Sequence, residues 1–139
     1  MDVEFFVDSD PDQGDLDLLA SWVRQETLAR SGLEEDLDLA VLARCHGRLV
    51  GGCYGGTWGG TCELQGLWVL PSLRRQGLGS RLLSSAEAEA VRRGCHQVVL
   101  LTHQIQATPR FYQQRGYRLA GRVEDYPKGS DALWFRKRL

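Results

Sequence analysis

Residues Leu67–Leu83, with the sequence LWVLPSLRRQGLGSRLL, decide the fold. Their first four residues are apolar and typical of a buried strand, a basic turn with two glycines follows, and the apolar spacing after it predicts a helix. A helix N-terminus carries partial positive charge and unpaired backbone N–H groups, so it binds anions. Gly77 and Gly79 have no Cβ atom, which lets a ligand approach the backbone closely. The stretch therefore predicts a strand, a loop that binds phosphate or pyrophosphate, and a helix.

The composition is that of an ordinary globular protein. The chain has 139 residues, of which 42% are hydrophobic and 25% charged, and this suits one domain spanning residues 1–139. The formal net charge of −1 gives no global basic field for nucleic acid. We find no basic leader and no apolar run of about 20 residues, so we expect a cytoplasmic protein that does not bind or cross a membrane. The four cysteines form no C-x-x-C pair, and we expect neither a metal site nor a disulfide framework.

Strands and helices are predicted along the whole chain. Strands are expected at 5–7, 39–44, 48–54, 61–70, 97–101, 117–123 and 132–137, and helices at 15–30, 78–93 and 108–115. His46-Gly47 predicts a hairpin turn, and the glycine-rich run 55–60 a flexible connection. Strand, helix and strand between residues 61 and 101 predict a right-handed crossover with parallel strands. The sequence therefore predicts an α/β fold.

Two ordered motifs resemble those of the GNAT superfamily of acyl-CoA-dependent N-acyltransferases, in a small single-domain bacterial-type form. Arg74-x-x-Gly77-x-Gly79 resembles its pyrophosphate loop, and residues 111–117, FYQQRGY, resemble its second motif. The resemblance spans about residues 61–117. It implies an α+β fold with a central mixed, mostly antiparallel sheet, two splayed central strands and flanking helices.

The resemblance also implies how a CoA thioester would bind. The pantetheine arm would enter where strand 67–70 splays from strand 97–101 and pair with free main-chain groups, like an added strand. The loop would surround the pyrophosphate, and Arg75 would reach the 3′-phosphate. An amide at Gln106 replaces the asparagine that many members have there. The cofactor-binding residues implied are Leu67, Trp68, Val69, Arg74, Arg75, Gln76, Gly77, Leu78, Gly79, Ser80, Gln106 and Tyr112.

Acyl transfer to an amine needs a base and an acid. An alkylammonium with a pKa near about 10.4 must lose a proton, and the departing thiolate must gain one. Tyr112 matches the frequent general acid of the family, and its alternative is a core aromatic beside Phe111. Glu63 matches a catalytic glutamate of some members; its alternatives are binding a cationic substrate and a solvated strand position. His103 is the rival base.

These motifs predict an N-acetyltransferase that moves an acetyl group from acetyl-CoA to a primary amine by direct attack in a ternary complex. The alternatives are a non-catalytic acyl-CoA-binding regulatory module and a small interaction domain that uses the fold without CoA. Peptide N-termini, lysines, polyamines, antibiotics and small amines all stay open as acceptors, as does an acyl group longer than acetyl. Exposed sheet edges are compatible with a homodimer.

Overall fold

A computed structural model describes residues 1–34, 36–106 and 108–139 of the chain. Contacts between residues divide it into two compact units, Met1–Glu35 and Asp36–Leu139. The expected organisation as one domain over residues 1–139 stays a prediction. No helix in the described part of the chain is long and apolar enough to cross a membrane.

The first unit contains one helix, α1 (Gln13–Ser31). The side chain of Asp12 caps its N-terminus by accepting from the N–H of Asp15, and Gly32 ends it in the left-handed conformation. This confirms the predicted helix 15–30 and extends it at both ends. The strand predicted at residues 5–7 is wrong, because a strand needs a hydrogen-bonded neighbour and the described residues of this unit contain no other strand.

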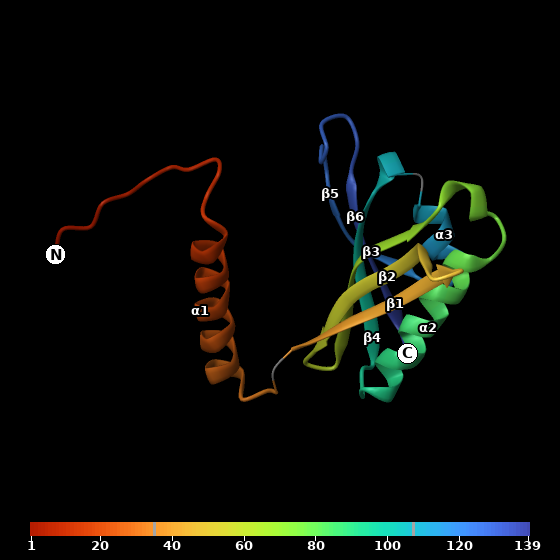
Figure 1. The fold of residues 1–139 in the computed structure, drawn as a ribbon, viewed down its shortest axis with the longest axis horizontal. Helices are drawn as coiled ribbons and strands as arrows, with labels where there is room; N and C mark the ends of the chain where they lie inside the picture. The colour runs from red at the N-terminus through yellow and green to blue at the C-terminus, as the bar shows by residue number, and fades with distance from the viewer. Residues whose placement is uncertain (35, 107) are drawn as a thin grey trace. The chain divides into compact units, whose positions relative to one another are not determined.

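The second unit is built on a six-stranded sheet in the order β1-β2-β3-β4-β6-β5 (Figure 1). Only β3 and β4 pair in parallel, which confirms the predicted crossover and a mixed, mostly antiparallel sheet. Helix α2 (Leu78–Arg92) packs across β1 to β4 and buries Leu82, Leu83, Ala86 and Ala90. The strands are β1 (Leu37–Cys45), β2 (Arg48–Trp58), β3 (Thr61–Val69), β4 (Gln97–His103), β5 (Arg118–Val123) and β6 (Ala132–Arg138).

The glycine-rich run 55–60 is mostly strand, so the predicted flexible connection is wrong. Strand β2 continues to Trp58, and only Gly59 and Gly60 turn the chain, at φ values of 59° and 81°. A Cβ atom on Gly55 would lie 1.9 Å from the carbonyl oxygen of Glu63, beside a register shift between β2 and β3. Glycine is present there because two backbones approach closely in a bulge, and not because the segment is a loop.

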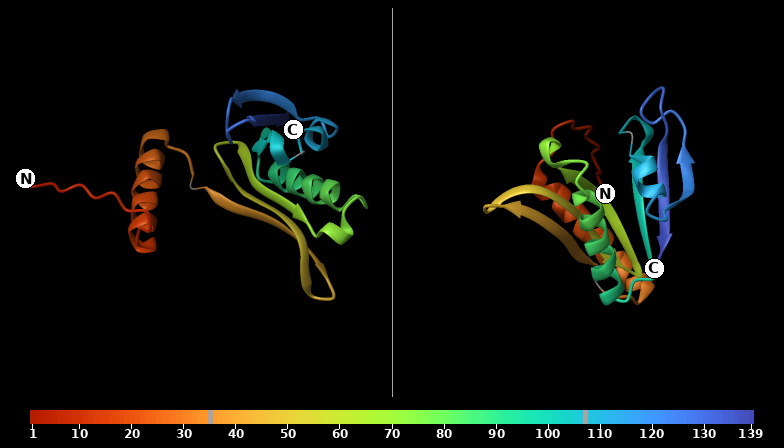
Figure 2. Two further views of the ribbon diagram at one scale, coloured as in Figure 1. Left: turned by 90° about the horizontal axis from the view of Figure 1, so that it is seen from above. Right: turned by 90° about the vertical axis from the view of Figure 1, so that its right-hand side faces the viewer.

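Strands β3 and β4 separate part-way along their length. They pair over Thr61–Leu64 and Gln97–Leu100, yet β3 continues to Val69 and β4 to His103. The right-hand view of Figure 2 shows the two strands diverging as the sides of a V. This confirms the predicted splay, and it leaves backbone groups on both strands available to a ligand.

Two short segments lie at the wide end of the V, one after each strand. The 3-10 turn η1 (Pro71–Leu73) connects β3 to α2, and the 3-10 turn η2 (Gln104–Gln106) follows β4. Helix α3 (Pro109–Gln113) comes next and is shorter than the predicted 108–115, because the N–H groups of Arg115 and Gly116 bond to the carbonyl three residues back and no longer to the one four residues back. The second motif therefore lies on a short helix beside the diverging strands.

Candidate active site

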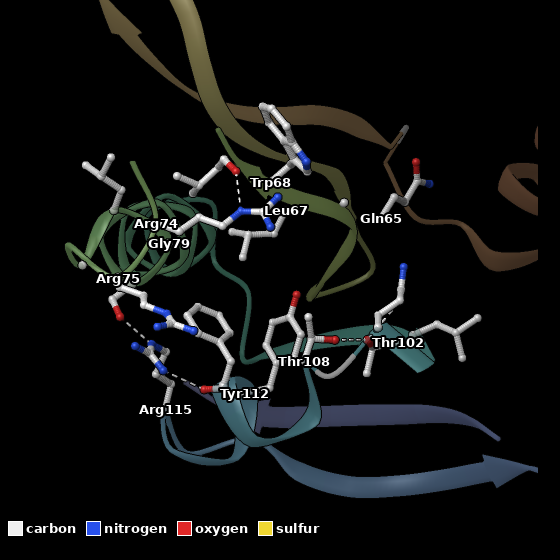
Figure 3. Close-up of a pocket in the computed structure, with 18 residues that line it drawn as sticks. Gln65, Leu67, Trp68, Arg74, Arg75, Gly79, Thr102, Thr108, Tyr112 and Arg115 are labelled. Carbon is white, nitrogen blue, oxygen red and sulfur yellow. Dashed lines mark hydrogen bonds between the residues drawn. The ribbon is translucent and has the colours of Figure 1, made fainter. Parts of the chain in front are cut away.

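A cleft of about 580 Å³ opens between the diverging strands (Figure 3). Among the described residues, its lining contains three arginines and neither aspartate nor glutamate, so its electrostatic character suits an anion. The segments that contribute are β3, the loop before α2, the first turn of α2, β4, η2, Thr108 and α3, with Arg115 just beyond α3. The lining residues are Gln65, Gly66, Leu67, Trp68, Val69, Arg74, Arg75, Gly77, Leu78, Gly79, Ser80, Leu101, Thr102, Gln106, Thr108, Phe111, Tyr112 and Arg115.

The loop before α2 has the geometry of an anion site. Gly77 is the N-cap of α2 with a φ of 82°, and Arg75 also has a positive φ of 61°. No side chain caps this end, and no acidic residue lies in the first turn. The N–H groups of the first turn therefore have no side-chain acceptor and are available to a bound anion.

Gly79 lies where α2 contacts the second motif. A Cβ atom at this position would lie 3.4 Å from the Phe111 ring and 3.9 Å from Leu67. A larger side chain there would have to project into the space between the loop and α3. Both glycines of the first motif thus serve the cleft, one through its left-handed φ and one through its small size.

Arg74 folds back onto the end of β3. Its Nε donates to the carbonyl oxygen of Val69 at 2.8 Å, and its guanidinium lies 5.8 Å from the centre of the Trp68 ring. The Val69 carbonyl was expected to face the ligand, but it already accepts this hydrogen bond. Arg74 therefore braces the loop against the strand in addition to carrying positive charge into the cleft.

The Tyr112 side chain is buried, with 8% of its surface exposed, and its ring packs edge-on against Phe111 and Tyr117. Figure 3 shows its hydroxyl directed toward β3 across the cleft. Burial, and secondarily the neighbouring Cys53, raises the pKa of Tyr112 to about 12. The phenol is therefore protonated at neutral pH and able to donate a proton.

A polar cluster behind Tyr112 ties α2 to the end of the sheet. Glu87 of α2 accepts from the Tyr117 hydroxyl at 2.9 Å and from Nζ of Lys137 at 3.0 and 3.1 Å. Burial, and secondarily Glu87, raises the pKa of Tyr117 well above its usual value. Since Tyr117 contacts Tyr112, this cluster supports the position of the Tyr112 ring.

Gln106 lines the cleft, but its amide oxygen is occupied. It accepts from the Thr102 hydroxyl at 3.3 Å and from the backbone N–H of His103 at 3.1 Å. The amide group therefore has only its NH₂ to offer a ligand. Gln76, in contrast, is not among the residues that line the cleft.

The two candidate bases lie outside the cleft lining. Glu63 is exposed and alternates with the buried Cys62 and Leu64, and its carboxylate has no hydrogen bond or ion pair within the part of the chain described. Gln65, the next outward residue of β3, does line the cleft. Nδ1 of His103 lies 3.1 Å from the carbonyl oxygen of Tyr126, which only accepts, so Nδ1 carries the proton and neutral His103 keeps a lone pair on Nε2.

The sequence analysis missed several lining residues, of which Arg115 is the most polar. It lies four positions after Phe111 and therefore on the same side of the helical turn, which is the signal that would have identified it. Across the described ranges, no group of three or more His, Cys, Asp or Glu side chains is arranged to hold a metal ion.

Comparisons with known proteins agree with this geometry. A family model described as "Acetyltransferase (GNAT) family" matches residues 4–117. Blasticidin-S acetyltransferase from Streptomyces morookaense is 44% identical over 84 residues, 60% of this chain and 61% of that protein, so the match spans about three fifths of that relative. An acetyltransferase from Agrobacterium fabrum is 34% identical over 113 residues, 81% of this chain and 82% of that protein. A crystal structure of a protein from Agrobacterium tumefaciens superposes with a TM-score of 0.90 at 28% identity, covering 99% of this chain and 100% of that one.

Proposed function

The chain belongs to the GNAT acetyltransferase family, and from this premise we propose that it transfers the acetyl group of acetyl-CoA to a primary amine. The observation that carries the proposal is the cleft between β3 and β4, which combines three arginines, an uncapped helix N-terminus and unpaired strand backbone. A pyrophosphate joined to a long amide-bearing arm matches that combination.

The donor would bind along the cleft in two parts. The pyrophosphate would lie at the first turn of α2, against the N–H groups that follow Gly77. The pantetheine arm would run between the strands and pair with the main chain near Leu67 and Trp68. This placement brings the thioester to the region of Gln65, Gly66 and Tyr112.

The reaction would be direct attack in a ternary complex. The amine nitrogen forms a bond to the thioester carbon, and the carbon–sulfur bond then breaks. Tyr112 donates its phenolic proton to the departing sulfur. The nitrogen loses its second proton as the amide forms, and the Tyr112 phenolate, which the raised pKa makes a strong base, takes up that proton and becomes a phenol again. The proton that the ammonium must lose goes to a base before the attack.

We assign the base to Glu63, acting directly or through water. Its carboxylate is exposed, unpaired among the described residues, and on the same outward face of β3 as Gln65, which reaches the cleft. The same carboxylate would also attract a cationic acceptor. His103 is the competing assignment, since its free Nε2 is able to accept a proton.

The acceptor we propose to try first is blasticidin S, because the 44%-identical relative is named for acetylating it. A release assay for CoA thiol with acetyl-CoA and a panel of primary amines tests the function. Release that depends on both substrates supports it. Calorimetric binding of CoA with no release on any amine would instead favour the acyl-CoA-binding module, and absence of CoA binding would refute the proposal.

A further inference from the structure

Arg115 connects the two motifs of the cleft. Its Nε donates to the Ser80 hydroxyl at 2.6 Å, and its Nη1 donates to the Phe111 carbonyl oxygen at 2.8 Å. Its guanidinium also lies over the Phe111 ring, 3.8 Å from the ring centre. Figure 3 shows Arg115 at the same end of the cleft as Arg75. Three contacts therefore fix a side chain that lines the cleft.

The charge of Arg115 is not neutralised by its protein contacts. Both hydrogen-bond acceptors are neutral, the side chain is partly buried, and no aspartate or glutamate is among the described residues that line the cleft. A partly buried cation without a counter-ion is costly, and stacking on an aromatic ring offsets only part of that cost. An anion bound beside Arg115 would supply the missing counter-charge for its guanidinium.

Ser80 indicates where such an anion would lie. Ser80 is in the first turn of α2, where the backbone N–H groups have no intrahelical acceptor. Its hydroxyl oxygen accepts from Arg115, so its own O–H is left to donate to another group. Arg115 thus aims a hydroxyl donor at the position where the first turn of α2 also presents N–H donors.

We propose that Arg115 binds the pyrophosphate of the CoA donor and orients Ser80 to donate to the same group. This inference rests on the proposed function and deepens it. Ser80 and Arg115, which are 35 residues apart in the sequence, then both contact one diphosphate. Because Arg115 directly follows the α3 segment that carries Tyr112, donor binding is coupled to that segment. Arg115 then distinguishes nucleotide-bearing thioesters from those on pantetheine alone.

The test compares Arg115→Met with the wild type on two donors. Methionine keeps an unbranched apolar stem for the contact with Phe111 but removes the charge and both hydrogen bonds. We expect KM for acetyl-CoA to rise about tenfold to a hundredfold, the range of a lost charged hydrogen bond. With acetyl-pantetheine, which has no phosphate, the same variant should retain kcat/KM within about twofold of wild type.

Two further variants distinguish a loss of donor binding from a loss of folding. Arg110→Met removes an equal charge from an exposed position of α3 outside the cleft. It should leave kcat/KM unchanged for both donors. Arg115→Lys should recover part of the acetyl-CoA affinity, because it restores the charge without the fixed bond to Ser80. Should Arg115→Met fail to fold, Ser80→Ala with the same two donors replaces it, with an expected loss of several-fold for acetyl-CoA alone.

Several results would overturn the inference. Equal losses on acetyl-CoA and acetyl-pantetheine would show a purely structural role. A defect that disappears with 3′-dephospho-CoA would place Arg115 on the 3′-phosphate and not on the pyrophosphate. CoA binding to wild type together with unchanged binding to Arg115→Met refutes this inference alone, whereas a wild type that binds no CoA refutes the proposed function.

Discussion

The cleft side of β3 and its outward face present two different kinds of recognition surface. On the cleft side, a left-handed glycine, an uncapped helix turn and three arginines converge on one volume. On the outward face, Glu63 is exposed without a partner among the described residues, and Tyr54 lies over Gly66, where a Cβ atom would come within 2.3 Å of its ring. In the function proposed above, backbone geometry would therefore define the donor, and a few separate side chains would define the acceptor.

The difference determines how each surface responds to substitution. A site made of backbone N–H groups keeps its donors through most side-chain changes, provided that residues with a special conformation such as Gly77 are retained. A surface made of side chains changes with any one of them. The following variants test the two surfaces separately.

Gly79→Glu should have the largest effect. Its side chain would begin 3.4 Å from the Phe111 ring and bring negative charge to the first turn of α2, where we propose that the pyrophosphate binds. We expect CoA binding to fall by at least about a hundredfold, measured by titration calorimetry. Ser84→Glu, at an exposed position of the same helix, is the matched control. Wild-type affinity in the Gly79 variant would show that the loop assignment is wrong.

Tyr112→Phe should affect chemistry and leave donor binding intact. Removing the phenolic proton from this buried position should lower kcat by about a hundredfold, the lower range for a lost general acid, with little change in the Kd for CoA. Single-turnover measurements would show whether chemistry limits the rate. An unchanged rate under those conditions would exclude Tyr112 as the acid.

Glu63→Gln tests the outward face directly. We expect kcat to fall about tenfold with unchanged CoA binding, because an exposed base is partly replaced by water. Asp38→Asn, at an exposed position of β1, controls for the loss of one negative charge. A larger fall in kcat in His103→Gln than in Glu63→Gln would assign the role of base to His103 instead.

The strand, turn and helix beside the cleft could be predicted from the sequence because they are contiguous. Arg74, Gly77 and Gly79 lie within six residues, and this segment forms an uncapped helix N-terminus that suits an anion, while its role in donor binding stays a prediction. The spacing of Arg115 from Phe111 in the sequence is a local signal for its place beside the cleft, but its contact with Ser80, 35 residues away, is made by tertiary packing and could not be predicted. The predicted loop at Gly55 was wrong because a glycine in a bulge and a glycine in a loop look alike in sequence.

The cluster that supports the cleft should show a smaller effect, on stability. Glu87→Gln removes the carboxylate that pairs with Lys137, where the two side chains are 14% and 28% exposed. We expect the free energy of unfolding, measured by urea denaturation, to fall by about 2 kcal/mol. Glu26→Gln, in the pair with Arg30 that is 66% and 79% exposed, should change stability by less than about 0.5 kcal/mol. Equal losses in both variants would contradict a supporting role for Glu87.

The smallest expected effect is the pH response of the acid. The Tyr112 phenol is protonated below its raised pKa of about 12 and loses its proton only above that value. A general acid must be protonated to act, so kcat should fall by only about a tenth up to pH 11, where an ordinary phenol with a pKa near about 10 would have lost about nine tenths of its activity. The measurement is a pH profile of single turnovers with saturating acetyl-CoA and acceptor. A decline centred near pH 10 that disappears in Tyr112→Phe would mean that water reaches the phenol, and the cleft side would then be as open as the outward face.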